Sequence, residues 1–198
     1  MELPLYLLDI DENAEDQSSV FAVGLVTQPA IERNWMTFAA NKKEKFQVID
    51  TEKRILAGPL MAADQPIYRN DSDMGEYYVA FSAQVIEKIV TKYARSGKSL
   101  SFNINHNDNA MVNGAFLQQS FIIDSAKGIN TPEGFEKLPD GSWFGFVKID
   151  DEQVWNDEIK SGNLKGFSVE GYFNEVKILD AEQGIYENLK NKLLQCLN

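Results

Sequence analysis

The chain has 198 residues, 43% hydrophobic and 25% charged, which is enough apolar material for the core of one soluble domain. Its 30 acidic residues outnumber its 19 basic ones, and the resulting net charge of −11 disfavours binding to a nucleic-acid backbone. No segment approaches the roughly 20 apolar residues that a membrane span needs, and residues 1–8 lack the basic start and the length of a signal peptide. We therefore expect neither nucleic acid nor a membrane as a partner.

The histidine and cysteine content limits metal and redox chemistry. Cys196 is the only cysteine and His106 the only histidine, too few ligands for a zinc site and too few thiols for an internal disulfide. The acidic run at 9–19 lacks the glycine and the glutamate that a calcium loop would require at Ala14 and Val20. The sequence therefore predicts no metal or other cofactor, and it favours a reducing compartment such as the cytoplasm.

The first half of the chain predicts short strands and one helix. An almost entirely apolar run at 20–27 is typical of a central strand that is buried on both faces. Ser82 can cap a helix whose apolar positions follow the 3.6-residue period, and Gly97 can end it. Further strands are expected at 3–10, 46–50, 54–61 and 77–81, with a loop of turn residues at 64–75.

The second half continues this pattern. Strands are expected at 100–105, 115–124, 143–149, 164–173 and 175–179, with a polar turn at 107–114 and a loop at 125–141. Asp150 or Asp151 can cap a short helix that Gly162 ends. An apolar stripe predicts a last helix that needs a partner surface, and its members are Ile185, Leu189, Leu193 and Leu197.

Together these elements predict an α+β fold. We expect a mostly antiparallel sheet or barrel core of about eight or nine short strands, with about three helices. The expected organisation is one domain over 1–179 and an amphipathic helix over 180–198.

The candidate chemistry lies in Ser168, within the segment KGFSVEG, and in His106. A serine hydroxyl is a weak nucleophile that needs a base within hydrogen-bond reach, and imidazole is matched to that task. Side-chain alternation places Ser168 and Glu170 on one face of their strand, and it predicts that His106 ends the strand before the polar turn. A lone histidine at a strand end is, however, more often structural.

Two better-known motifs do not fit. The nucleophile elbow of α/β-hydrolases needs glycine two residues after the serine, where this chain has Glu170. The segment at 96–99 ends like a phosphate-binding loop, but the earlier glycine of that loop is replaced by Lys92.

An ordered set of segments resembles the prohead maturation serine proteases of tailed bacteriophages, which are related in fold to herpesvirus assemblin. The set spans roughly residues 20 to 178 and consists of YYVAFS at 77–82, NHN at 105–107 with Gly114, GSW at 141–143, residues 155–162, and KGFSVEG at 165–171. The order and the spacing carry the resemblance, since each segment alone is common.

The resemblance implies a catalytic pair of His106 and Ser168 on neighbouring strands. In many members a glutamate on the strand after the serine strand orients the histidine. Here the matching segment, 22–30, comes early in the chain, as in a circular permutation, and Ala22 stands at the position of the glutamate. Three alternatives are a Ser-His dyad, Asp108 near the histidine, or Glu170, which we favour because two residues along a strand span only about 6.6 Å.

The implied function is a serine endopeptidase that cleaves scaffold and capsid-protein segments, and often its own termini, inside an assembling procapsid in the host cytoplasm. The resemblance also implies a homodimer, for which the helix at 180–198 is the expected contact. The alternative is an inactive structural or scaffolding protein of capsid assembly that retains the fold, because the usual glutamate is absent.

Overall fold

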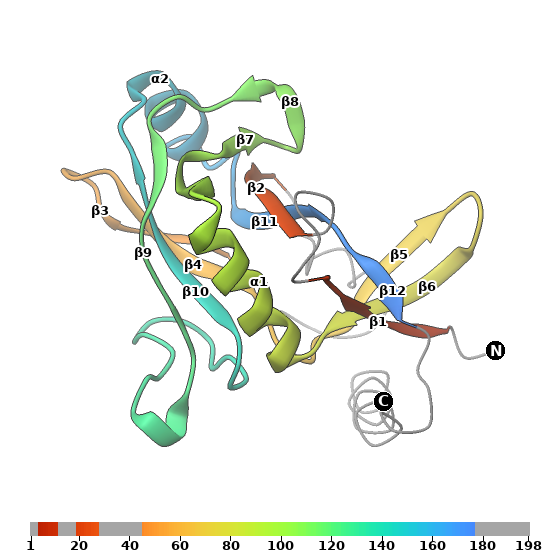
Figure 1. Cartoon of the computed structure of the whole chain (residues 1–198). Coiled ribbons are helices and arrows are strands. Elements are labelled where there is room, and N and C mark those ends of the chain that lie inside the picture. The colour runs from red at the N-terminus through yellow and green to blue at the C-terminus, as the bar shows by residue number, and fades with distance from the viewer. Residues whose placement is uncertain (1–3, 12–18, 28–44, 177–198) are drawn as a thin grey trace.

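A computed structural model of the chain describes residues 4–11, 19–27 and 45–176 (Figure 1). The expected helix at 180–198, and with it the domain boundary and the dimer contact, lies outside the described residues.

The described strands form three sheets of four strands each. The first sheet has the order β12 (Asn174–Val176), β1 (Leu5–Asp9), β6 (Gly75–Phe81) and β5 (Ile67–Asp71). The second has the order β3 (Gln47–Asp50), β4 (Ile55–Met61), β10 (Trp143–Ile149) and β9 (Ala115–Ile122). The third has the order β11 (Gly166–Tyr172), β2 (Ser19–Val26), β7 (Phe102–Ile104) and β8 (Asn107–Met111). The pairs β1–β6 and β2–β7 are parallel, and the other pairs of the described strands are antiparallel.

The structure confirms the α+β class and corrects two expectations about the sheets. Of the two expected forms, sheet or barrel, the described strands form open sheets, so the barrel alternative is wrong. The strands are also more numerous than expected, because β5 and β8 occupy segments that we had assigned to turns. Both are polar strands at the edge of a sheet. Because such strands are exposed to solvent, their sequences need not alternate apolar and polar residues, and the pattern that predicts a strand is missing.

The helices are short. The main one is α1 (Ala83–Arg95), and α2 (Glu152–Val154) continues as a π-helical turn, Trp155–Ile159. Single 3-10 turns lie at Lys98–Leu100 and Ser125–Lys127. As expected, Ser82 caps α1 by accepting a hydrogen bond of 3.3 Å from the backbone N–H of Val85, and Gly97 follows the helix with a left-handed φ of 66°.

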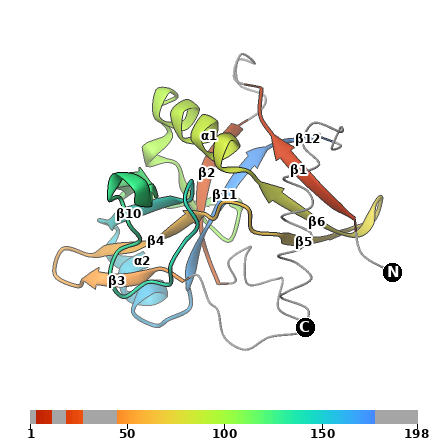
Figure 2. The same ribbon diagram turned by 90° about the horizontal axis from the view of Figure 1, so that it is seen from below.

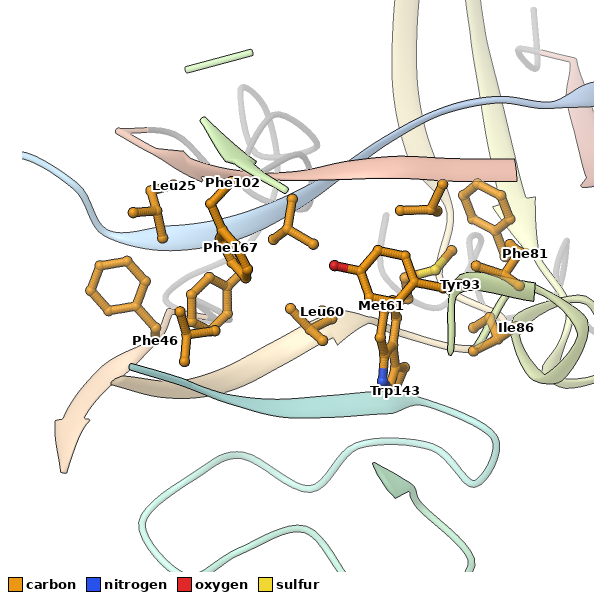
Figure 3. Packing of buried hydrophobic residues seen from close by; sticks show 14 of the residues in the cluster. Leu25, Phe46, Leu60, Met61, Phe81, Ile86, Tyr93, Phe102, Trp143 and Phe167 are labelled. Atoms are coloured by element: carbon orange, nitrogen blue, oxygen red, sulfur yellow. The ribbon is translucent and has the colours of Figure 1, made fainter. Parts of the chain in front are cut away.

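The main hydrophobic core joins α1 to strands from all three sheets. Figure 3 shows Leu25, Phe102 and Phe167 from the third sheet facing residues of β4, with Trp143 of β10 beside Tyr93 of α1. The rings of Tyr93 and Trp143 meet edge to face, with their centroids 5.2 Å apart.

The third sheet lies in the middle of this arrangement. Figure 2 shows β2 and β11 between the sheet that contains β3, β4 and β10 and the sheet that contains β1, β5 and β6. The prediction that 20–27 forms a central strand is confirmed, because β2 pairs with β11 on one side and with β7 on the other.

Candidate functional site

The serine and the histidine come from strands that are separated by one intervening strand. Ser168 of β11 lies opposite Gly24 of β2, and Gly24 lies opposite Asn103 of β7. The expectation that the serine and histidine strands are neighbours is therefore wrong, because β2 lies between them. Residues that share one register across a sheet point to the same face, so the three positions form a polar row.

His106 lies in a tight turn and not, as expected, at the end of a strand. Asn105 and His106 form the two-residue loop between β7 and β8, with left-handed φ values of 53° and 59°. Two consecutive residues with positive φ are typical of the type I′ hairpin turn, and asparagine tolerates that conformation well. The turn folds the chain back at once, which ends the strand and raises the imidazole above the neighbouring β2.

The histidine contacts the carboxylate that shares a face with the serine. Nδ1 of His106 lies 3.1 Å from Oε2 of Glu170, and these side chains are 38% and 21% exposed. Asp108, the other carboxylate that we considered, is exposed on β8, and within the described residues no hydrogen bond or ion pair joins it to His106. Of the two carboxylates, Glu170 is the one placed to orient the ring.

A third polar side chain, which the sequence analysis missed, holds this pair in place. Asn103 is fully buried, and its Nδ2 donates a hydrogen bond of 2.8 Å to Oε2 of Glu170. Its Oδ1 accepts a hydrogen bond of 3.1 Å from the backbone N–H of His106. One amide therefore binds both the carboxylate and the turn. The available signal was a polar residue between Phe102 and Ile104 in an otherwise apolar strand.

Gly24 leaves the space that the imidazole occupies. A Cβ atom at this position would lie 3.0 Å from Cε1 and 3.1 Å from Nδ1 of His106, so the ring lies directly over the glycine. Ser168 is the residue of β11 opposite Gly24, so the ring lies over the position on β2 that faces Ser168. Among the described residues, no hydrogen bond joins His106 to Ser168. A missing side chain on β2 thus allows His106 to reach across that strand.

The arrangement contains the groups that can activate a serine hydroxyl as a nucleophile. When Nδ1 carries its proton toward Glu170, Nε2 is left as an acceptor for a hydroxyl proton. A carboxylate, an imidazole and a serine hydroxyl in this order are the groups with which serine hydrolases activate the hydroxyl.

A cavity of about 580 Å³ borders Ser168, His106 and Glu170. Ser168 itself is only 6% exposed and lies in the wall of this cavity. In the part of the chain that the structure describes, no cluster of three or more histidine, cysteine, aspartate or glutamate residues could hold a metal ion. None of the described helices is long and apolar enough to cross a membrane.

Comparison with protein-family models, with curated proteins and with solved structures found no match to this chain.

Proposed function

We propose that the protein is a serine endopeptidase in which Ser168 is the nucleophile, His106 the general base and Glu170 the residue that orients the histidine. The observation that carries the proposal is the contact between Nδ1 of His106 and Oε2 of Glu170, made over Gly24, the residue of β2 that lies opposite Ser168. A carboxylate on Nδ1 also occurs at structural histidines, so the proposal depends on the position of this pair over the residue that faces Ser168.

The chemistry would follow the usual acyl-transfer sequence. Oγ of Ser168 attacks the peptide carbonyl carbon while its proton moves to Nε2 of His106. The C–N bond then breaks, the amine leaves with that proton, and an acyl group remains on Ser168. Water attacks the acyl carbon and gives a proton to Nε2 of His106. The bond between the acyl carbon and Oγ then breaks, the carboxylic acid leaves, and the proton returns from His106 to Oγ of Ser168. Throughout, Glu170 stabilises the imidazolium that forms in each half-reaction.

The register of β11 and β2 supports Glu170 as the third member. Glu170 lies opposite Ala22, the position at which the resemblance places the missing glutamate. A carboxylate from the adjacent strand, at the same register, can therefore approach the imidazole that a glutamate at residue 22 would orient. This correspondence supports the assemblin-like, circularly permuted arrangement, which remains part of the proposal.

The biological role that we propose is the maturation of a phage prohead in the host cytoplasm. The substrates would be scaffold and capsid-protein segments, and a homodimer would form through the helix at 180–198. These points rest on the resemblance.

The second candidate is an inactive structural or scaffolding protein of capsid assembly. One observation favours it: Ser168 is only 6% exposed, and a nucleophile must be reached by its substrate.

Labelling with a fluorophosphonate probe decides between the two. The folded wild-type protein should be labelled at Ser168. We expect Ser168→Ala to abolish labelling, His106→Ala to slow it by about 10²–10⁴-fold, and Glu170→Gln to slow it by at least about tenfold.

Ser120→Ala is the matched control, because Ser120 is an exposed serine of β9 outside the site, and its loss should leave labelling unchanged. A wild-type protein that is folded by circular dichroism and is not labelled would establish the structural alternative.

A further inference from the structure

The cavity beside Ser168 follows β11 along most of its length. Every residue from 167 to 173 lines it. Successive side chains of a strand point to opposite faces, so a cavity that touches seven consecutive residues must run along the edge of the strand. Among the described strands β11 pairs only with β2, which leaves its other edge without a described strand partner.

The opposite wall of the cavity is apolar. It is formed by β5 and β6 and by the end of β4, through Leu60, Met61, Ile67, Tyr77, Val79 and Phe81. Arg69 of β5 also lines the cavity. Figure 1 shows that the hairpin of β5 and β6 extends on the side of the molecule toward which β11 runs.

We propose that this groove binds an extended peptide, rich in apolar side chains, as an additional strand on the edge of β11 that has no described strand partner. The unpaired backbone groups of an edge strand can hydrogen-bond to such a peptide, and wall pockets can select its alternate side chains. The volume of about 580 Å³ lies within the range of ordinary ligand sites. Because Ser168 belongs to the same strand, a peptide bound in this way brings its backbone carbonyl groups to the hydroxyl.

The groove would define the class of substrate for the proposed endopeptidase, so the kinetic test of this inference rests on the proposed function. The probes are p-nitrophenyl acetate, N-acetyl-triserine p-nitrophenyl ester and N-acetyl-trileucine p-nitrophenyl ester. All carry the same leaving group, so differences in kcat/KM report on binding of the acyl part. We expect kcat/KM for the trileucine ester to exceed that for the triserine ester by at least about tenfold, because only the leucine side chains bury apolar surface against the apolar wall.

A pair of variants tests whether the preference originates in the groove. Tyr172 lines the groove and is 66% exposed, whereas Leu100 is 68% exposed and is not among the lining residues. Tyr172→Glu places a carboxylate in the groove and should lower the kcat/KM ratio of the trileucine ester to the acetate ester by several-fold. Leu100→Glu adds the same charge elsewhere and should leave the ratio unchanged.

A binding measurement keeps the inference testable if the protein is inactive. N-acetyl-trileucine amide is titrated into ¹⁵N-labelled Ser168→Ala protein, and its binding should shift the amide signals of residues 167–173 and of Ile67. Equal kcat/KM for the two tripeptide esters would overturn the inference while leaving the hydrolase intact. Absence of both ester hydrolysis and fluorophosphonate labelling would overturn the proposed function, and the absence of shifts on titration would overturn the groove independently.

Discussion

The two faces of the strands β11, β2 and β7 hold different kinds of residue, in rows that alternate along the strands. One face carries two apolar rows, Phe167–Leu25–Ile104 and Val169–Val23–Phe102. The other carries the polar row Ser168–Gly24–Asn103, with Glu170 opposite Ala22 beside it. The apolar face packs into the main core, whereas the polar face holds the candidate site. One set of strands thus serves both stability and the proposed chemistry, with the two separated by the alternation of side chains.

Burial alone does not distinguish the two faces. Asn103 is as fully buried as its neighbour Phe102. A buried amide is tolerated only when it is hydrogen-bonded, and Asn103 meets this condition through Glu170 and the backbone of His106. The comparison therefore predicts that substitutions on the apolar face change mainly stability and that those on the polar face change mainly reactivity.

The largest effect is expected from Phe102→Ala on the apolar face. Its ring is fully buried in the main core, and truncation should lower the free energy of unfolding by about 3–5 kcal/mol. Chemical denaturation measures this change. Leu100→Ala, at a position that is 68% exposed, is the control and should change stability by no more than about 0.5 kcal/mol. A loss below about 1 kcal/mol for Phe102→Ala would show that this face is not part of the core.

The next effect is expected from Asn103→Ala on the polar face. The substitution removes a donor from Glu170 and the acceptor that holds the His106 turn, so fluorophosphonate labelling should slow by about tenfold. The unfolding free energy should fall by only about 1–3 kcal/mol. Measurement well below the midpoint of unfolding separates reactivity from stability.

Two further variants sharpen this prediction. Asn103→Asp keeps the size of the side chain but places a second carboxylate beside Glu170, and it should also slow labelling. Asn109→Ala, at an exposed asparagine of β8, should have no effect. Labelling at the wild-type rate in Asn103→Ala would show that Asn103 has no part in positioning the site.

Local patterns in the sequence predicted the apolar face better than the polar one. Local patterns were enough to predict the buried strand β2, the helix α1 and the shared face of Ser168 and Glu170. None of these predictions needed tertiary information. The insertion of β2 between β11 and β7 depends on long-range pairing, which no local pattern encodes. The role of Asn103 was missed because its partner Glu170 comes from a distant part of the chain. The left-handed turn at His106 is local, but Asn105-His106 lacks the glycine that marks most two-residue hairpin turns in a sequence.

The smallest effect is expected from Gly24→Ala, and it tests the polar face most directly. The new Cβ would lie 3.0 Å from Cε1 of His106. Because the His106 side chain can rotate away from it, the unfolding free energy should change little. The ring would then move away from Glu170 and Ser168, and labelling should slow by about three- to tenfold.

Gly58→Ala is the matched comparison from the second sheet. Its Cβ would lie 2.8 Å from the Cα atom of Phe46, which is backbone and cannot rotate away. This variant should therefore lose about 1–3 kcal/mol of unfolding free energy and, while folded, label at the wild-type rate. Gly24→Ala should therefore change mainly the labelling rate, and Gly58→Ala should change mainly the unfolding free energy. If Gly24→Ala instead destabilised the protein and left labelling unchanged, the imidazole would not lie over Gly24 in solution, and the proposed path from Ser168 to His106 across β2 would fail.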